Sequence, residues 1–300
     1  MSSLTKKGIL AAADKAIIAA RPALEIVKNF TVDFSADAVK PGTGVVVDVV
    51  KAAAESFDAT SANYGHATNS STPVTVAANI RKKSTFSLTD LDALEDETGA
   101  ALAGNAIASG RAVGAELVKA VTGLLVDAKA ESTGLPLAGA TLADYFALRG
   151  AIETAGVDPA VCVMLLKPTQ YSQLCSVLNA GIVGDGSVVR GGVIGAALGF
   201  KAVYSAPTIG GAGCGFVVPE NALAVVNRVV KPINGTVGGL IEYGEHVDEV
   251  SGLVTTHRVI YNAEKGEAFW THEGLIGAAL TKSGTNGAPG FYKIALPAAG

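Results

Sequence analysis

Residue types that commonly carry out catalysis are sparse in this 300-residue sequence. Its glycine-rich stretches at 181–199 and 210–215 contain neither a G-x-G-x-x-G turn nor a G-x-x-x-x-G-K-[ST] loop, so no phosphate-binding loop is predicted. No serine lies in a G-x-S-x-G turn, and neither Cys162 nor Cys175 has a base beside it in the sequence. The sequence therefore predicts no catalytic residue and no cofactor, and we expect a protein that is not an enzyme.

A zinc site is the next kind of chemistry that the sequence suggests. His272-Glu273 begins like the H-E-x-x-H motif, but Ile276 occupies the position of the second histidine ligand. The three cysteines have no metal-ligand spacing and form no even set. We interpret them as buried small apolar residues in a reducing compartment, and no metal site is predicted.

Two histidines could still meet in the folded chain. His257 and His272 are predicted on neighbouring strands, where they could pair across the sheet, and the alternative is that both are ordinary strand residues. We interpret Glu245, His246 and Asp248 as a solvated turn rather than a metal site. Neither group by itself predicts a reaction.

Composition limits the classes of function. Charged residues make up 17% of the chain, against about 25% in ordinary soluble domains. This shortage favours either an extensive subunit interface, since covered surface needs no charge, or an alanine-rich chain with a large core. The net charge of −4 argues against a dedicated nucleic-acid binder, and no apolar run is long enough to predict a membrane span.

The stretch 87–128 organises the predicted elements, because most of it predicts one long helix. Ser87 or Thr89 could cap this helix, and acidic residues follow where the first-turn amides are unpaired. Gly114 lies on its apolar stripe, although glycine inside a helix costs about 1 kcal/mol relative to alanine. We therefore expect Gly114 to pack closely against a strand of the closing β region, so that Gly114→Leu destabilises the fold by about 1–3 kcal/mol.

The chain before this helix predicts two further features. Residues 8–29 predict an amphipathic helix that Pro22 breaks or kinks, and its docking partner is either its own core or a neighbouring subunit. Residues 44–50 and 74–80 read as strands.

A polar segment, 51–73, connects these two strands. Its large apolar side chains are Phe57 and Tyr64, and so polar a connection predicts either an extended arm or a floppy surface loop. If it is an arm, we expect Phe57 and Tyr64 to make inter-subunit contacts.

The rest of the chain predicts a mixed α/β block and then an antiparallel β meander. The block contains helices at 141–156, where Asp144 follows a Thr141 cap, at 167–179 and at 219–227, and strands at 160–166, 199–205 and 215–218. The meander contains strands at 240–244, 253–261, 268–273 and 275–280.

This order of elements resembles that of the major capsid proteins of tailed bacteriophages with the Hong Kong 97 fold. Residues 254–262, VTTHRVIYN, and 273–277, EGLIG, look like the final strands of such coat proteins. Residues 167–174, KPTQYSQL, look like the helix after the first strand of their axial domain, and 199–203, GFKAV, like a later strand. The resemblance covers nearly the whole chain.

The resemblance implies an α+β fold with an N-terminal arm, an extended β-hairpin loop, a long spine helix, a mixed α/β axial domain and a closing antiparallel meander. The implied segments are 1–40 for the arm, 41–86 for the extended loop, 87–140 for the peripheral domain with its spine helix, 141–235 for the axial domain and 236–300 for the closing strands of the peripheral domain.

The function that the resemblance implies is a major capsid protein. Such a protein self-assembles through pentamers and hexamers into an icosahedral shell, is part of the virion, and is assembled in the host cytoplasm. Its implied partners are further copies of itself, separate scaffolding, portal and decoration proteins, and packaged DNA enclosed without sequence-specific binding, but no membrane. Met1 at the start favours a chain that is not cleaved.

Two alternatives remain open at this point. The first is an encapsulin-like nanocompartment shell protein, which would have the same fold. The second, from another class, is a soluble α/β enzyme that uses the glycine-rich loops.

Overall fold

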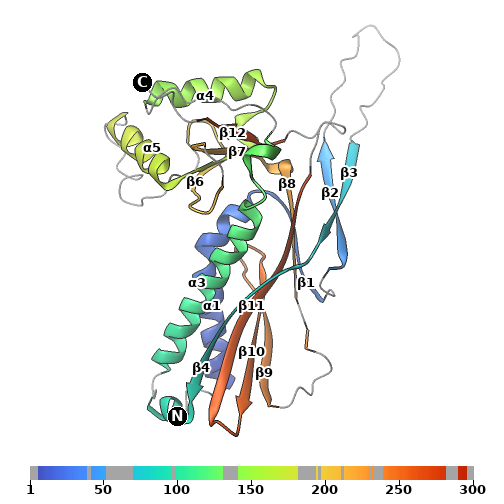
Figure 1. The fold of residues 1–300 in the computed structure, drawn as a ribbon, viewed down its shortest axis with the longest axis vertical. Helices are drawn as coiled ribbons and strands as arrows, with labels where there is room; N and C mark the ends of the chain where they lie inside the picture. The colour runs from blue at the N-terminus through green and yellow to red at the C-terminus, as the bar shows by residue number, and fades with distance from the viewer. Residues whose placement is uncertain are drawn as a thin grey trace. The chain divides into compact units, whose positions relative to one another are not determined.

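The structure is a computed structural model, and its described residues form a mixed α+β protein (Figure 1). The described residues are 6–38, 42–51, 70–95, 99–130, 141–181, 194, 197–210, 213–229, 231–232, 239–281 and 290–295. The chain divides into two compact units, of which the first comprises 1–45, 76–124 and 225–278 and the second comprises 46–75, 125–224 and 279–300. The five segments that the resemblance implies stay a prediction. None of the described helices is long and apolar enough to cross a membrane.

In the first unit, helix α1 (Lys6–Lys28) packs along helix α3 (Ala100–Thr122) (Figure 1). Pro22 lies inside α1 without ending it, so of its two expected effects, a break or a kink, the break is wrong. A Cβ atom on Gly110 would lie only 2.6 Å from the carbonyl carbon of Ala16, which shows how closely the two backbones approach. The N-terminal helix thus docks on its own unit, which decides between the two partners that the sequence left open.

The long helix predicted over most of 87–128 is wrong in its length, because only Ala100–Thr122 form α3. Its first residues belong to strand β4 (Ile80–Thr89), which is followed by the short helix α2 (Asp90–Glu95). Gly99 then adopts a left-handed conformation with φ of 71°, and α3 starts after it. Residues 80–89 pair with a neighbouring strand along their whole length, and this tertiary pairing outweighs the helix signal at 87–89.

The two candidate caps therefore have other roles. Ser87 lies within β4, whereas Thr89 caps α2. The Thr89 hydroxyl accepts a hydrogen bond from the Asp92 backbone N–H at 3.1 Å, and the Asp92 carboxylate accepts one from the Thr89 N–H at 3.0 Å. This is a capping box, and it begins a helix of one and a half turns rather than the spine.

The main sheet of the first unit has the strand order β1-β8-β11-β10-β9, and β4 also pairs with β11. Its further strands are β1 (Thr31–Ala38), β8 (Leu223–Val229), β9 (Leu240–Val247), β10 (Val254–Asn262) and β11 (Glu267–Leu280). The predicted meander is confirmed as β9–β10–β11, except that β11 is one continuous strand instead of two.

The helix predicted at 219–227 is wrong. A short 3-10 turn at Glu220–Ala222 leads directly into β8, in which every residue is buried. This segment is buried on both faces and contains three valines, as is typical of a strand inside a sheet. The helix-start signal at Pro219 is weaker than this tertiary environment.

The apolar core of the first unit lies between the two long helices and one face of the sheet. Trp270 of β11 is its largest buried side chain and lies 5.1 Å from Phe86, measured between ring centroids. The other members are Ile9, Ala12, Ala13, Ala16, Leu88, Leu102, Ala106, Val259 and Ala268.

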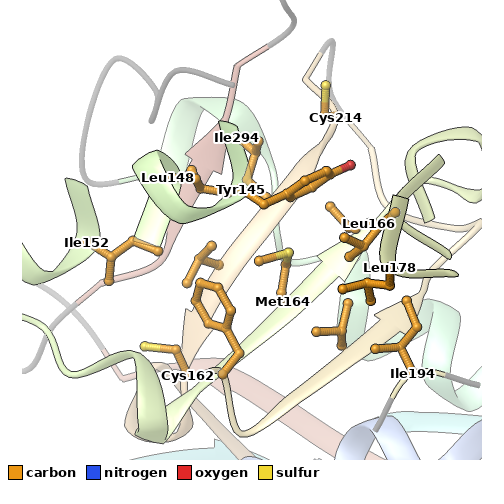
Figure 2. Packing of buried hydrophobic residues seen from close by; sticks show 14 of the residues in the cluster. Tyr145, Leu148, Ile152, Cys162, Met164, Leu166, Leu178, Ile194, Cys214 and Ile294 are labelled. Carbon is orange, nitrogen blue, oxygen red and sulfur yellow. The ribbon is translucent and has the colours of Figure 1, made fainter. Parts of the chain in front are cut away.

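The second unit packs two helices on a four-stranded sheet of order β12-β7-β5-β6. The elements are α4 (Leu142–Thr154), β5 (Cys162–Leu166), α5 (Pro168–Gly181), β6 (Ala202–Ser205), β7 (Gly215–Pro219) and β12 (Tyr292–Ile294). Figure 2 shows Tyr145 and Leu148 of α4 above Met164 of β5 in the buried core. Apart from the last helix, the predicted elements of this block are confirmed, including the Thr141 and Asp144 capping box.

Strands β2 (Gly44–Lys51) and β3 (Ser70–Ala77) form a separate two-stranded sheet. The first predicted strand is confirmed, whereas the second, 74–80, is confirmed only to Ala77, because Ile80 belongs to β4. The connection between them, 52–69, lies outside the described residues.

Candidate functional site

Three of the chain's four histidines meet on the helix-covered face of the first unit's sheet. We call His246 of β9, His257 of β10 and His272 of β11 the histidine cluster. His257 and His272 are direct partners in the β10–β11 register and both are fully buried. The cross-strand pairing that the sequence allowed for these two residues is confirmed.

A chain of hydrogen bonds leads from this cluster to α1. The Nδ1 atom of His246 lies 3.1 Å from Asp14 Oδ1, and its Nε2 atom lies 2.7 Å from His257 Nδ1. Because a carboxylate accepts, a neutral His246 carries its hydrogen on Nδ1 and accepts from His257 Nδ1–H through Nε2. This assignment leaves His257 Nε2 as a buried acceptor without a partner among the described residues.

His272 makes no side-chain hydrogen bond within the described parts of the chain, where both of its ring nitrogens lack a partner. Its surroundings are aromatic, because the Trp270 indole lies 5.8 Å from it with an interplanar angle of 4°. The same indole lies 6.1 Å from the His257 ring at 13°. Trp270 therefore contacts both buried imidazoles.

Gly244 of β9 makes room for this arrangement. A Cβ atom at Gly244 would lie 2.5 Å from His257 Cε1 and 3.4 Å from His246 Nε2. A side chain there would displace the rings that carry the hydrogen-bond chain. Glycine inside a strand often marks such a close approach, so Gly244 is the sequence signal that could have placed β9 against the predicted histidine pair.

Burial sets the protonation state of the two inner histidines. It lowers the pKa of His257 to about 4, with a further contribution from nearby His246. It lowers the pKa of His272 to about 3, with smaller contributions from His246 and His257. Both imidazoles are therefore neutral near neutral pH, since a protonated ring would be a buried cation without a counterion.

A second polar contact joins α1 to the β9–β10 turn. Arg21 donates through Nε to Asp248 Oδ1 at 3.0 Å, and the same carboxylate accepts from the Ser251 N–H at 2.9 Å. Burial opposes ionisation of Asp248, but the hydrogen bonds from Arg21 and Ser251 outweigh it and lower its pKa. The interpretation of 245–248 as a solvated turn is wrong, because His246 lies in β9 and Asp248 is only 2% exposed.

The opposite face of the sheet carries a charged cluster around Glu273, the neighbour of His272. Glu273 is 2% exposed and accepts from Arg81 Nε of β4 at 2.7 Å. It also forms an ion pair with Arg258 of β10. One buried carboxylate thus links three adjacent strands, which gives it a structural role.

The described residues offer little for covalent or metal chemistry. They contain no group of three or more His, Cys, Asp or Glu side chains placed to hold a metal ion. Burial raises the pKa of the Cys162 thiol to about 12 and also raises the pKa of Cys214, so both remain protonated thiols. The chemical property that stands out is the buried, neutral histidine pair.

The site residues singled out from the sequence are placed as follows. Phe57 and Tyr64 lie outside the described residues. Gly114 is buried in α3, and a Cβ atom on it would lie 3.1 Å from the Cα, Cβ and O atoms of Ala20 in α1. The expected strand partner is therefore wrong at Gly114, because α1 occupies that side, while the role of Gly114 in spine packing stays a prediction.

A strand does approach α3 one turn further along. A Cβ atom on Gly274 of β11 would lie 2.8 Å from Leu117 Cδ1. Here the glycine is on the strand and the large side chain is on the helix, which reverses the arrangement expected from the sequence.

No protein-family model matches the chain, and no curated protein matches it. Its structure is similar to solved structures from phages. For Mycobacterium phage Che8 the TM-score is 0.48 at 15% sequence identity, over 87% of this chain and 95% of that chain. For the structure described as the capsid of the cyanophage P-SCSP1u it is 0.49 at 12% identity, over 90% and 87%. For Gordonia phage Cozz it is 0.46 at 14% identity, over 90% and 86%.

Proposed function

We propose that the chain is a major capsid protein, the repeating subunit of an icosahedral phage shell. The observation that carries the proposal is the order in which the chain builds its two units. Helix α3 and the closing strands β9–β11 share one unit, although the stretch 125–224, which belongs to the other unit, lies between them in sequence. The β2–β3 pair precedes α3. This is the order that the resemblance to capsid proteins with the Hong Kong 97 fold implies.

The surface of the chain supports an assembling subunit. Large apolar side chains are exposed in both units, among them Ile18 at 54% on α1, Phe146 at 49% on α4 and Val247 at 54% on β9. Single exposed apolar residues are ordinary, but here they accompany a charged fraction of only 17%. A subunit whose surface is covered by copies of itself needs fewer charged residues to stay in solution.

In this proposal the function is assembly, without bond-making chemistry. Copies of the chain form pentamers and hexamers, and the segment between β2 and β3 reaches a neighbouring copy. The shell encloses DNA without sequence-specific contacts, in keeping with a net charge of −4. The protein belongs to the virion and is assembled in the host cytoplasm, with separate scaffolding, portal and decoration proteins as further partners.

Electron microscopy of purified particles tests the proposal. Closed icosahedral shells that hold nuclease-protected DNA are the expected result. Shells filled with a protein cargo would instead identify an encapsulin-like compartment, and a small oligomer on gel filtration would favour a soluble enzyme. A chain that stays monomeric at micromolar concentration would contradict both kinds of shell.

If the segment between β2 and β3 is an arm, a substitution in it should weaken shell assembly without affecting the folding of the subunit. Phe57→Ala should weaken shell assembly while the melting temperature of the subunit stays unchanged, because a large apolar side chain buried between chains contributes about 1.5–3 kcal/mol at each copy. Light scattering measures assembly and calorimetry measures subunit melting.

The matched control is Phe200→Ala, at a fully buried position of the second unit. This change should lower the melting temperature, since Phe→Ala in a core costs about 3–5 kcal/mol. If Phe57→Ala lowers melting to the same extent, Phe57 belongs to the subunit's own core and the arm contact is disproved.

A further inference from the structure

The histidine cluster lies where α1 meets the sheet, and its inner members are stable only while neutral. His257 and His272 are fully buried, and three of their four ring nitrogens have no hydrogen-bond partner within the described part of the chain. The fourth, His257 Nδ1, bonds to His246 rather than to an acid. A proton taken up by either ring would create a buried cation that nothing compensates.

The charged groups on the surrounding elements do not bond to the two inner rings. On α1, Asp14 bonds to His246 and Arg21 bonds to Asp248 at the end of β9. Between β4 and α3, Lys82 and Glu116 form their own ion pair at 3.3 Å. Among the described residues, therefore, no carboxylate lies within hydrogen-bonding distance of the His257 or His272 rings.

We propose that the histidine cluster is an acid-sensitive switch that releases helix α1 from the sheet when His257 and His272 take up protons. This device is separate from shell assembly and does not depend on the proposed function.

Helix α1 is the neighbouring element that the hydrogen-bond chain ties to the cluster, through Asp14 and His246. The three strands that carry the cluster are hydrogen-bonded to one another, so they stay paired when this tie is lost.

The direction of the pH effect follows from proton linkage. With α1 in place the pKa values of His257 and His272 lie at about 4 and about 3, below the ordinary histidine value of about 6.5 that applies once the rings are hydrated. The detached state therefore binds more protons, and detachment becomes more favourable as the pH falls from 6.5 toward these values. Each histidine can raise the detachment constant up to about tenfold per pH unit in that window.

The sole tryptophan of the chain, Trp270, makes this measurable, because it contacts both imidazoles. In the full-length protein, lowering the pH from 7 to 3 should quench and red-shift its fluorescence before the far-UV circular dichroism is lost. Over the same range, peptides from α1 should exchange amide hydrogens at least about tenfold faster after correction for the intrinsic rate, while peptides from α4 stay protected. Coincident loss of fluorescence, circular dichroism and α4 protection would mean global unfolding and would overturn the proposal.

Three variants identify the residues responsible. The double variant His257→Gln, His272→Gln should lose the fluorescence transition or move it to lower pH, whereas His66→Gln, which replaces the remaining histidine, should leave it unchanged. Asp14→Ala, at an exposed side chain that does not threaten folding, should move the transition to higher pH because α1 loses its bond to His246. An unchanged midpoint in Asp14→Ala, or a wild-type transition retained in the double variant, would overturn the switch.

Discussion

Replacing Gly110 by alanine is expected to lower the free energy of unfolding of the first unit by about 1–3 kcal/mol. The added Cβ atom would lie 2.6 Å from the carbonyl carbon and 2.8 Å from the Cα atom of Ala16. These are backbone atoms of α1, so no side-chain rotation can relieve the clash and the helices must separate. Urea unfolding monitored by the fluorescence of Trp270, which lies in the same unit, measures the loss.

Gly104 provides a matched control in the same helix. It is exposed, and a Cβ atom on it would meet nothing within 4 Å. Gly104→Ala should therefore stabilise the unit by about 0.5–1 kcal/mol through helix propensity alone. If Gly110→Ala stabilises the unit as well, α1 does not lie against α3 in the way described.

The stability change caused by Gly114→Ala should lie between those caused by Gly110→Ala and Gly104→Ala. The Cβ atom added at Gly114 would lie 3.1 Å from Ala20, a distance that α1 can relieve by moving a few tenths of an ångström. Gly114→Ala should thus change stability less than Gly110→Ala does, whereas Gly114→Leu should cost about 1–3 kcal/mol by overpacking. The two helices run parallel, because Gly110 and Gly114, four positions apart on α3, meet Ala16 and Ala20, four positions apart on α1.

The elements that the sequence predicted well are those whose signals are local. Helix α4 has a capping box formed by Thr141 and Asp144 over a span of four residues, and β5 is a continuous apolar run bounded by a proline turn. The turns of the β9–β11 meander are likewise marked by nearby glycine. In such segments the local sequence preference and the tertiary contacts favour the same secondary structure.

Where the prediction failed, partners distant in sequence decide the structure. Ser87 and Thr89, followed by the acidic residues Asp90 and Asp92, suggest the start of a long helix, but all of 80–89 pairs with β11. At 219–227 a proline followed by an acidic residue suggests a helix, but burial on both faces produces β8. Local propensity is a weak prior wherever a strand is completed by residues from another part of the chain.

The histidine cluster likewise has one part that the sequence could predict and one part that depends on distant residues. The pairing of His257 with His272 could be inferred from the order of two adjacent strands. The contact between His246 and Asp14, which joins residues 232 positions apart, has no counterpart in the sequence because nothing there places α1 over β9. Only the glycine at 244 hinted that something large lies against this strand.

Asn227→Leu is expected to lower the free energy of unfolding of the first unit by at least about 3 kcal/mol. Asn227 is a fully buried residue of β8 whose amide group bonds to backbone atoms of two other strands. Its Nδ2 atom donates to the carbonyl oxygens of Val254 and Leu275, each at 3.0 Å, and its Oδ1 atom accepts from the Val254 N–H at 2.6 Å.

Leucine branches at the same carbon as asparagine but offers no hydrogen bond, so three buried backbone groups would lose their partner. Each unsatisfied buried group costs about 1–3 kcal/mol, which is why the loss should exceed that of an ordinary core substitution. The control is Asn105→Leu on the exposed face of α3, which should leave stability unchanged or slightly raised because leucine is the better helix former. Equal unfolding midpoints for the two variants would show that the Asn227 amide does not hold β8 to β10 and β11, and the position of β8 in the sheet would then need another explanation.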